Sequence, residues 1–458
     1  MDNKYTAGID KFINDNRENI IRDIARLVAI DSVEGKAEPG APFGKGPKQA
    51  LELGLEICRE LGLEAVNCED KIGYGQIGDA EDYLATITHL DVVPVGEGWT
   101  GDPFTLRERE GYIIGRGVMD DKGPSVLCLY ALKYLKDAGV PLRYSIRALL
   151  GTNEETGMGD VEYYLDNYKA PVFCFSPDSG FPVCNGEKGI CNLRIVSKTK
   201  LDKIADIRGG VAGNVIPGKA EAWVKGAKPA ATESVSVEAD GELWHLTAKG
   251  IGGHASKPEG TVNAIGVLIS YILENKLAGE EEEKFLRLLM KLHESWDGSG
   301  LGVDADDGKF EPLTIIGGVI GVEDGHIFQT VDSRYPTNTS GRKIADTISA
   351  LAGGLAEIEL KRDTAPFYMS IDNSAVKVCM DVYNAVTGED AKPYTMGGGT
   401  YARDFPNGVS FGPEHPERSY PDFFGPIHGA DEAASIDEFM EALKIYILAL
   451  IELEAVEF

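Results

Sequence analysis

Strand-like and helix-like segments alternate in the first half of this chain, and this alternation restricts the folds that it can adopt. Residues 83–88 (YLATIT), 143–151 (RYSIRALLG) and 171–176 (PVFCFS) have the apolar pattern of buried strands. A helix with one apolar face begins at Pro124 and ends at Gly139. Alternation of this kind predicts an α/β domain with a mostly parallel sheet flanked by helices. In such sheets, ligands bind beyond the carboxyl ends of the strands.

Each of these three strands is followed by a polar residue that can bind a cation. His89 follows the first strand, Glu154 and Glu155 follow the second, and Asp178 follows the third. Two adjacent carboxylates repel each other unless a cation compensates them. The pair therefore suggests that one glutamate binds metal while the other moves protons. The alternative readings are a solvated surface pair at 154–155 and an ordinary turn residue at 178.

A second acidic pair lies in GRGVMDDKGP (115–124), where Asp120 and Asp121 precede a helix. A carboxylate at this end of a helix can be a simple cap. Two carboxylates after a glycine-bounded turn exceed what a cap needs, so a carboxylate that bridges two cations is the sharper hypothesis. Asp91, two residues after His89, is placed to fix the tautomer of that imidazole.

Seven histidines occur in the chain, and His89 and His428 have unusually polar, glycine-rich neighbours. His428 lies in IHGADEAAS, just before a last helix that begins at a capping box formed by Ser435 and Glu438. Two histidines and several carboxylates, without cysteine, suit zinc, manganese or cobalt in a two-metal site. They argue against a structural zinc, which usually recruits thiolates.

The pattern changes after residue 187. Alternating strand-like runs and glycine-rich turns precede helices at 263–277 and 279–295. A weak echo relates GGVAGNVIPGKAEAWV (209–224) to GGVIGVEDGHIFQTV (317–331), each interpreted as a GGVxG turn leading into a strand, although chance could produce it. We therefore predict an inserted α+β lid domain of two similar halves (188–371) that interrupts a catalytic domain (1–187 and 372–458).

The composition excludes two classes of partner. Acidic residues number 74 against 45 basic ones, so the net charge is −29, which disfavours nucleic acids and anionic membranes. This charge indicates either a soluble surface or a cluster of buried carboxylates that binds cations. No run approaches the roughly 20 apolar residues of a membrane span, and the N-terminal segment has the pattern of an amphipathic helix rather than a signal peptide. Seven scattered cysteines without a C-x-x-C pair favour reduced thiols in a cytoplasm.

Taken together, these motifs resemble the M20 metallopeptidase family, which includes PepV-like dipeptidases, carnosinases and aminoacylases. The resemblance covers nearly the whole chain, and the likeness to PepV-like dipeptidases is the strongest. The motifs occur in the order and spacing of the family: ARLVAIDSV (25–33), HLDVVPVGEGWTGDPF (89–104), GRGVMDDKG (115–123), NEETGMGD (153–160), SPDSGFP (176–182), GGHASKPEGTVNAI (252–265) and FGPIHGADE (424–432).

The resemblance implies two divalent metal ions per chain, with zinc as the first expectation and manganese or cobalt as alternatives. Asp120 would bridge the ions, His89 and Asp178 would complete one site, and Glu155 and His428 the other.

Further roles come from the same resemblance. Glu154 would be the general base, Asp91 would support His89, and the Asp120–Asp121 peptide would be cis. From the lid, His254 would polarise the tetrahedral intermediate. The remaining implied residues are substrate contacts: Asn214, Arg334, Gly398, Thr400 and Arg403.

The expected activity is hydrolysis of Xaa-Xaa dipeptides with free termini. An N-acyl amino acid deacylase or a tripeptidase of the same family is an alternative, and a non-catalytic peptide-binding protein is a third, which the presence of Glu154 disfavours. Because the lid could supply His254 within one chain, a monomer could be complete, with a dimer as the alternative.

Overall fold

The computed structural model describes residues 4–458 and divides the chain into two compact units. Unit 1 contains the chain up to Asn185 together with Met369–Tyr394 and Gly399–Phe458, and unit 2 contains Gly186–Tyr368 and Thr395–Gly398. The sequence placed the divisions after residues 187 and 371 and did not separate residues 395–398. This short segment lies in unit 2 although the residues on both sides of it belong to unit 1.

Unit 1 is built on a mixed sheet with the strand order β1-β2-β6-β3-β7-β22-β9. The central strands β6, β3, β7 and β22 are parallel, whereas β1, β2 and β9 add antiparallel strands at the two sides. The predicted α/β class is confirmed, and the parallel part of the sheet consists of these four central strands. The strands are β1 (Glu64–Cys68), β2 (Ile72–Ile77), β3 (Tyr83–His89), β6 (Ser145–Gly151), β7 (Phe173–Ser176), β9 (Val183–Glu187) and β22 (Gly408–Phe411).

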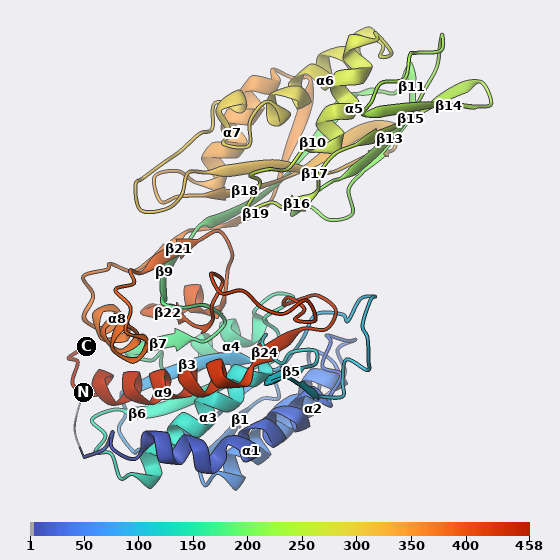
Figure 1. The fold of residues 1–458 in the computed structure, drawn as a ribbon. Coiled ribbons are helices and arrows are strands. Elements are labelled where there is room, and N and C mark those ends of the chain that lie inside the picture. The colour runs from blue at the N-terminus through green and yellow to red at the C-terminus, as the bar shows by residue number, and fades with distance from the viewer. Residues whose placement is uncertain (1–3) are drawn as a thin grey trace. The chain divides into compact units, whose positions relative to one another are not determined.

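Helices α1, α3 and α9 pack together beside this sheet (Figure 1). Helix α3 is buried around nearly its whole circumference, because it contacts β3 and β6 as well as α1 and α9. A helix in such a position must be apolar on all sides, and α3 carries the buried run Val126–Leu132. The helices of unit 1 are α1 (Ile9–Val28), α2 (Lys45–Glu60), α3 (Lys122–Asp137), α4 (Gly159–Asn167), α8 (Ser374–Thr387) and α9 (Ile436–Leu453).

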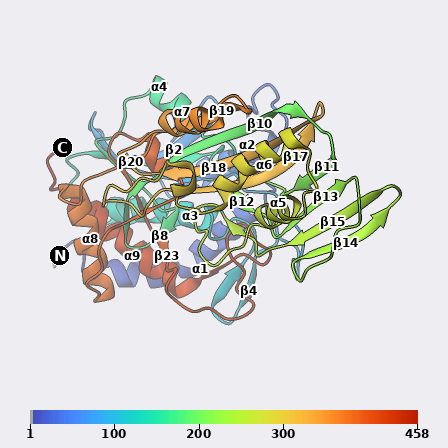
Figure 2. The ribbon, with the colours of Figure 1, turned by 90° about the horizontal axis from the view of Figure 1, so that it is seen from above.

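Unit 2 contains an antiparallel sheet with the order β14-β15-β13-β11-β17-β18-β10-β19. Helices α5 (Ala264–Glu274), α6 (Glu280–His293) and α7 (Gly341–Ala352) pack on it, as Figure 2 shows from above. The predicted α+β character is therefore present. The strands are β10 (Gly189–Lys200), β11 (Ile204–Gly209), β13 (Lys219–Val224), β14 (Val235–Asp240), β15 (Leu243–Lys249), β17 (Thr314–Glu323), β18 (His326–Tyr335) and β19 (Ala356–Thr364).

Shorter strands complete the two units. They are β4 (Arg107–Arg109), β5 (Tyr112–Ile114), β8 (Ser179–Gly180), β12 (Val215–Ile216), β16 (Gly253–His254), β20 (Phe367–Tyr368), β21 (Tyr394–Met396), β23 (Pro413–Glu414) and β24 (Ala433–Ser435). β12 pairs with β16, β8 with β23, and β24 with β5 and through it β4, whereas β20 and β21 pair with β9.

The second GGVxG segment is not a turn, and that prediction was wrong. Gly317–Gly321 lies inside β17, whereas Gly209 ends β11 and begins a true turn. The glycines permit close packing of one segment on the other: a Cβ on Gly318 would lie 2.2 Å from the Gly213 carbonyl oxygen. Glycine inside a strand often marks such a close approach of two backbones. The two similar sequences thus contact each other but have different conformations.

Two smaller predictions also need correction. The predicted capping box at α9 is half formed: the Ser435 hydroxyl accepts from the Glu438 amide, but the Glu438 carboxylate accepts from Arg418 and Tyr420 instead. The strand predicted from residue 143 begins at Ser145, because the amides of Arg143 and Tyr144 donate to the Glu454 carboxylate rather than to a neighbouring strand.

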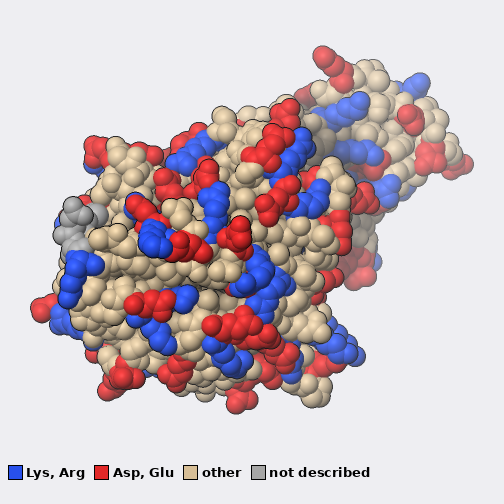
Figure 3. Space-filling model, turned by 60° about the horizontal axis from the view of Figure 1, so that its bottom comes forward, with Lys and Arg blue, Asp and Glu red and all other residues tan. Residues whose placement is uncertain are grey.

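The surface mixes both signs of charge. Figure 3 shows acidic and basic side chains interspersed over one face of the molecule. All seven cysteines are buried free thiols. Within residues 4–458, none of the helices combines the length and the apolar character needed to traverse a bilayer.

Candidate metal centre and active site

His89 is the last residue of β3 and is fully buried. Its Nε2 atom lies 2.9 Å from Asp120 Oδ1 and 3.9 Å from Asp178 Oδ2. Asp178 follows β7, the parallel neighbour of β3, so the two strands deliver their side chains to the same sheet edge. The carboxyl ends of two central strands therefore supply His89 and Asp178, and Asp120 meets them from the turn before α3.

The Asp120 carboxylate lies between two imidazoles. Asp120 Oδ1 faces His89, and Asp120 Oδ2 lies 2.9 Å from His428 Nε2. The same His428 atom is 3.2 Å from Glu155 Oε2. With one oxygen directed to each histidine, the carboxylate has the arrangement that a ligand shared by two cations requires.

The donor set fits divalent cations. Ligand atoms of His89, Glu154 and Asp178 lie within 4.8 Å of one another, as do those of His89, Asp120 and Glu155. Buried His89 Nε2 makes no hydrogen bond among the described residues, although Asp120 Oδ1 is only 2.9 Å away. When an imidazole nitrogen and a carboxylate oxygen both bind one metal ion, they lie close together without being aligned for a hydrogen bond. Imidazole and carboxylate ligands suit zinc, manganese or cobalt.

The electrostatics agree with this fit. Desolvation, together with the negative charge of Asp178, raises the pKa of Glu154 well above its usual value, and desolvation and Asp120 do the same for the pKa of Asp178. Hydrogen bonds to Asp120 and Glu155 raise the pKa of His428 to about 11. The cluster has more negative charge than its imidazoles balance, so it must bind protons or cations.

Asp91 positions the two glutamates as well as His89. The Asp91 main-chain oxygen lies 3.0 Å from His89 Nδ1, and its carboxylate is farther from that atom, at 3.5 Å. The carboxylate instead accepts the backbone N–H groups of Glu154, at 3.2 Å, and Glu155, at 3.1 Å. Asp91 thus orients the imidazole through its carbonyl and the two glutamates through its side chain.

Glu432 is a residue of the site that the sequence interpretation missed. Its buried carboxylate accepts from Arg116 Nη1 at 2.7 Å and from the backbone N–H groups of Gly117, Met119 and Asp120 at 3.0–3.1 Å. It thereby holds the turn that presents Asp120. In the sequence, Glu432 lies in HGADE, four residues after His428, and this local pattern does not distinguish it from a surface acid.

Asp160 was also missed, and it holds the loop that carries Glu154 and Glu155. Its carboxylate accepts from the amides of Thr152 and Asn153 and from the Tyr401 hydroxyl. Burial raises the pKa of Asp160 to about 6. Asp121 has a similar role, since its carboxylate accepts the His89 amide at 3.2 Å. The Asp120–Asp121 peptide is cis, as the family resemblance implied.

Unit 2 brings His254 and Asn214 together. His254 in β16 pairs with Val215 in β12, and the Ala255 amide donates to the Asn214 carbonyl at 2.9 Å. Both side chains are exposed. His254 Nδ1 lies 2.7 Å from the Ser256 hydroxyl, which orients the ring.

Arg334 lies at the end of β18 and is nearly buried. Its guanidinium donates to both Asp332 oxygens, at 2.7 and 3.2 Å, and to the Gly397 carbonyl at 2.9 Å. A Cβ on Gly397 would be 3.0 Å from the Ser256 Cβ. The segment with Gly397 and Gly398 therefore connects Arg334 to the His254 turn inside unit 2.

Thr400 and Arg403, the other predicted substrate contacts, lie in unit 1. The buried Thr400 hydroxyl accepts from the Ala402 amide and is 2.9 Å from the Ser410 hydroxyl, so it caps the short helix η2 (Tyr401–Asp404). Arg403 lies within η2 and is partly exposed.

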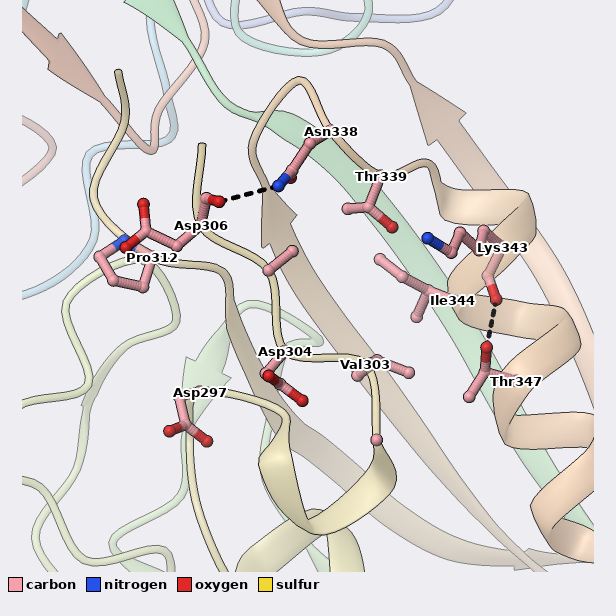
Figure 4. Close-up of a pocket in the computed structure, with 12 residues that line it drawn as sticks. Asp297, Val303, Asp304, Asp306, Pro312, Asn338, Thr339, Lys343, Ile344 and Thr347 are labelled. Atoms are coloured by element: carbon pink, nitrogen blue, oxygen red, sulfur yellow. Dashed lines mark hydrogen bonds between the residues drawn. The ribbon is translucent and has the colours of Figure 1, made fainter. Parts of the chain in front are cut away.

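A separate pocket of about 470 Å³ in unit 2 contains none of the predicted site residues (Figure 4). Its wall includes Asp297, Asp304, Asp306 and Lys343. Asp297 accepts from Ser295 and Ser299, and Asp306 accepts from the Gly308 amide. These two carboxylates are therefore used in local turns.

Known proteins share both the sequence pattern and the fold of this chain. Residues 85–452 match the model of the family described as Peptidase family M20/M25/M40. The chain is 33% identical over 460 residues to the Beta-Ala-Xaa dipeptidase of Lactobacillus delbrueckii subsp. lactis, covering 95% of this chain and 96% of that protein. It is 32% identical over 461 residues to YtjP of Bacillus subtilis (strain 168), covering 95% and 97%.

Among solved structures, the di-peptidase Dug1p from Saccharomyces cerevisiae superposes with a TM-score of 0.61 at 13% identity, covering 99% of each chain. At this identity, the likeness concerns the fold alone.

Replacing Glu432 should weaken metal binding. In Glu432→Gln and Glu432→Ala, the turn that presents Asp120 loses its anionic acceptor, so we expect the affinity for Zn²⁺ to fall about 10–100-fold, with the larger effect for alanine. Competition with a chromophoric chelator measures it. Asp437→Ala, at an exposed carboxylate, is the control. Affinities equal to that of the wild type would refute this positioning role.

Proposed function

The chain belongs to peptidase family M20/M25/M40, and we propose that it is a metal-dependent dipeptidase acting on short peptides with free termini. The observation that carries the proposal is the Asp120 carboxylate, which directs one oxygen to His89 and the other to His428. A relative named Beta-Ala-Xaa dipeptidase, similar over 95% of this chain, supports the dipeptide as substrate.

We assign two divalent ions to the cluster, with zinc first and manganese or cobalt as alternatives. Asp120 would be shared, with His89 and Asp178 on one ion and Glu155 and His428 on the other. Glu154 lies near the first group, but three protein ligands already suffice for a catalytic site that keeps an open position. When bound, such ions make a nucleophilic water available near neutral pH and polarise a carbonyl.

Glu154 then has the role of general base. It takes a proton from the attacking water and returns it to the leaving amine nitrogen. A carboxylate suits both steps because it can accept a proton and return it within one reaction cycle. Asp91 fixes the backbone of Glu154 and so supports the position of this base.

Residues of unit 2 complete the proposed substrate contacts. His254 would stabilise the developing oxyanion, and Arg334 and Asn214 would hold the substrate carboxylate. Arg334 suits this task because Asp332 already fixes its planar guanidinium. Gly398 and Arg403 are assigned as further contacts. Thr400 is assigned with them, and its hydroxyl also caps η2.

The proposed setting is a cytoplasm, where the seven free thiols would remain reduced. Neither nucleic acid nor membrane is a proposed partner, given the net charge of −29.

Removing the base should abolish turnover but not metal binding. We expect Glu154→Gln to lower kcat by about 10²–10⁴-fold with nearly unchanged metal content, measured by dipeptide hydrolysis and elemental analysis. Glu162→Gln, at an exposed glutamate of the following helix, should behave like the wild type. Full activity of Glu154→Gln would exclude the mechanism.

Metal removal should inactivate the enzyme reversibly. Dialysis against a chelator should remove activity, and adding back Zn²⁺, Mn²⁺ or Co²⁺ should restore it on free dipeptides, including a β-alanyl dipeptide. N-acetylated dipeptides and tripeptides should remain poor substrates. If the N-acetylated substrates were preferred, the enzyme would be a deacylase instead.

A single chain should suffice for activity, because both sets of proposed residues belong to it. We expect a monomer in size-exclusion chromatography with light scattering, and a specific activity that stays constant on dilution. Loss of specific activity on dilution, together with a larger species at high concentration, would show that a second copy is needed.

A further inference from the structure

An apolar pocket of about 290 Å³ lies in unit 1. Its wall is formed by Met119, Tyr420, Phe424, Pro426 and Ile427, among others. Tyr420 and Phe424 stack with their ring centroids 4.1 Å apart, so one side is a rigid aromatic surface. Ile427 is 38% exposed, so part of this apolar wall faces solvent.

The wall of this pocket is linked through the chain to the proposed metal centre. Met119 precedes Asp120 in the chain, and Ile427 precedes His428, so each wall residue is one Cα step from a proposed ligand. Glu414, which also lines the pocket, lies in β23 and pairs with Gly180 of β8, two residues after Asp178. The pocket is therefore formed in part by the two loops that carry the proposed ligands Asp120 and His428.

The wall chemistry selects an apolar occupant. The polar residues of the wall are Glu414 and His415, and burial lowers the pKa of His415, so that its imidazole is uncharged near neutral pH. The rest is aliphatic, aromatic or proline. The volume equals that of about ten liquid water molecules, which is enough for one large side chain.

We propose that this pocket is the side-chain subsite of the enzyme and that it selects dipeptides with a large apolar residue, such as leucine or phenylalanine, on one side of the scissile bond. The proposal rests on the dipeptidase function proposed above and names the substrate class within it. Binding in the pocket removes apolar surface of the side chain from water, and this gain is greatest when the side chain fills the wall.

Two series of substrates test the subsite with the metal-loaded wild-type enzyme. They are Xaa-Gly and Gly-Xaa, where Xaa is glycine, alanine, leucine or phenylalanine. In one series, kcat/KM should rise about tenfold or more from glycine to leucine, since even one methylene in an apolar pocket is worth about tenfold. The series that rises shows which residue of the dipeptide enters the pocket.

A pair of adjacent phenylalanines provides the matched variants. Phe424→Ala removes the aromatic wall and should lower the ratio of kcat/KM for leucine over glycine about tenfold in that series. Phe423 packs against Tyr112 and Arg109 and does not line the pocket, so Phe423→Ala should keep the wild-type ratio. If Phe424→Ala does not fold, Phe424→Leu should lower the ratio for phenylalanine over glycine while circular dichroism remains native.

The outcomes separate the two proposals. If all dipeptides are inert, Gly-Gly included, the dipeptidase function fails and the subsite fails with it. If dipeptides are hydrolysed but neither series rises with side-chain size, the subsite alone is overturned. Equal ratios in the Phe423→Ala and Phe424→Ala variants would also overturn it.

Discussion

The position of the Asp120 carboxylate between His89 and His428 is the constraint on which the rest of the site depends. The two histidines come from segments more than 300 residues apart, and each contacts a different oxygen of the same side chain. A shift of that carboxylate would separate the two halves of the cluster. The surrounding structure is accordingly dense in hydrogen bonds directed at backbone groups, which hold the loops carrying the ligands.

Four buried or nearly buried carboxylates without a proposed metal contact do this work. Glu432 holds the turn before Asp120, Asp121 holds the His89 amide, and Asp91 and Asp160 hold the loop of Glu154 and Glu155. Each accepts main-chain N–H groups that would otherwise be buried without acceptors, which is costly. The loops beyond the strand ends thus gain rigidity from side chains, because no ladder of strand hydrogen bonds reaches them.

Local patterns in the sequence were enough to predict one part of the fold and of the site. Apolar periodicity was enough to recognise the central strands and the helix after Asp120. Polar residues directly after those strands marked the positions of His89, the glutamate pair and Asp178. Contacts between distant segments could not be read in this way. Glu432 satisfies amides that lie more than 300 positions earlier, and nothing in the local pattern of HGADE distinguishes it from a surface acid. The turn predicted at residue 317 was wrong for the same reason, because the glycines of this segment pack against the distant turn near Gly213.

The net charge of −29 has two possible origins, which are exposed acidic residues and a cluster of buried carboxylates. Few of the 74 acidic side chains are buried in residues 4–458, and more than half of those few surround the metal centre. The net charge is therefore mainly a property of the surface, where Figure 3 shows many exposed acidic side chains. The buried carboxylates act over a shorter range: they create a region with more negative charge than its two imidazoles balance. Because cations can enter from solvent and carry compensating charge without disturbing the fold, this local excess, and not the total of −29, accounts for a site built to hold metal ions.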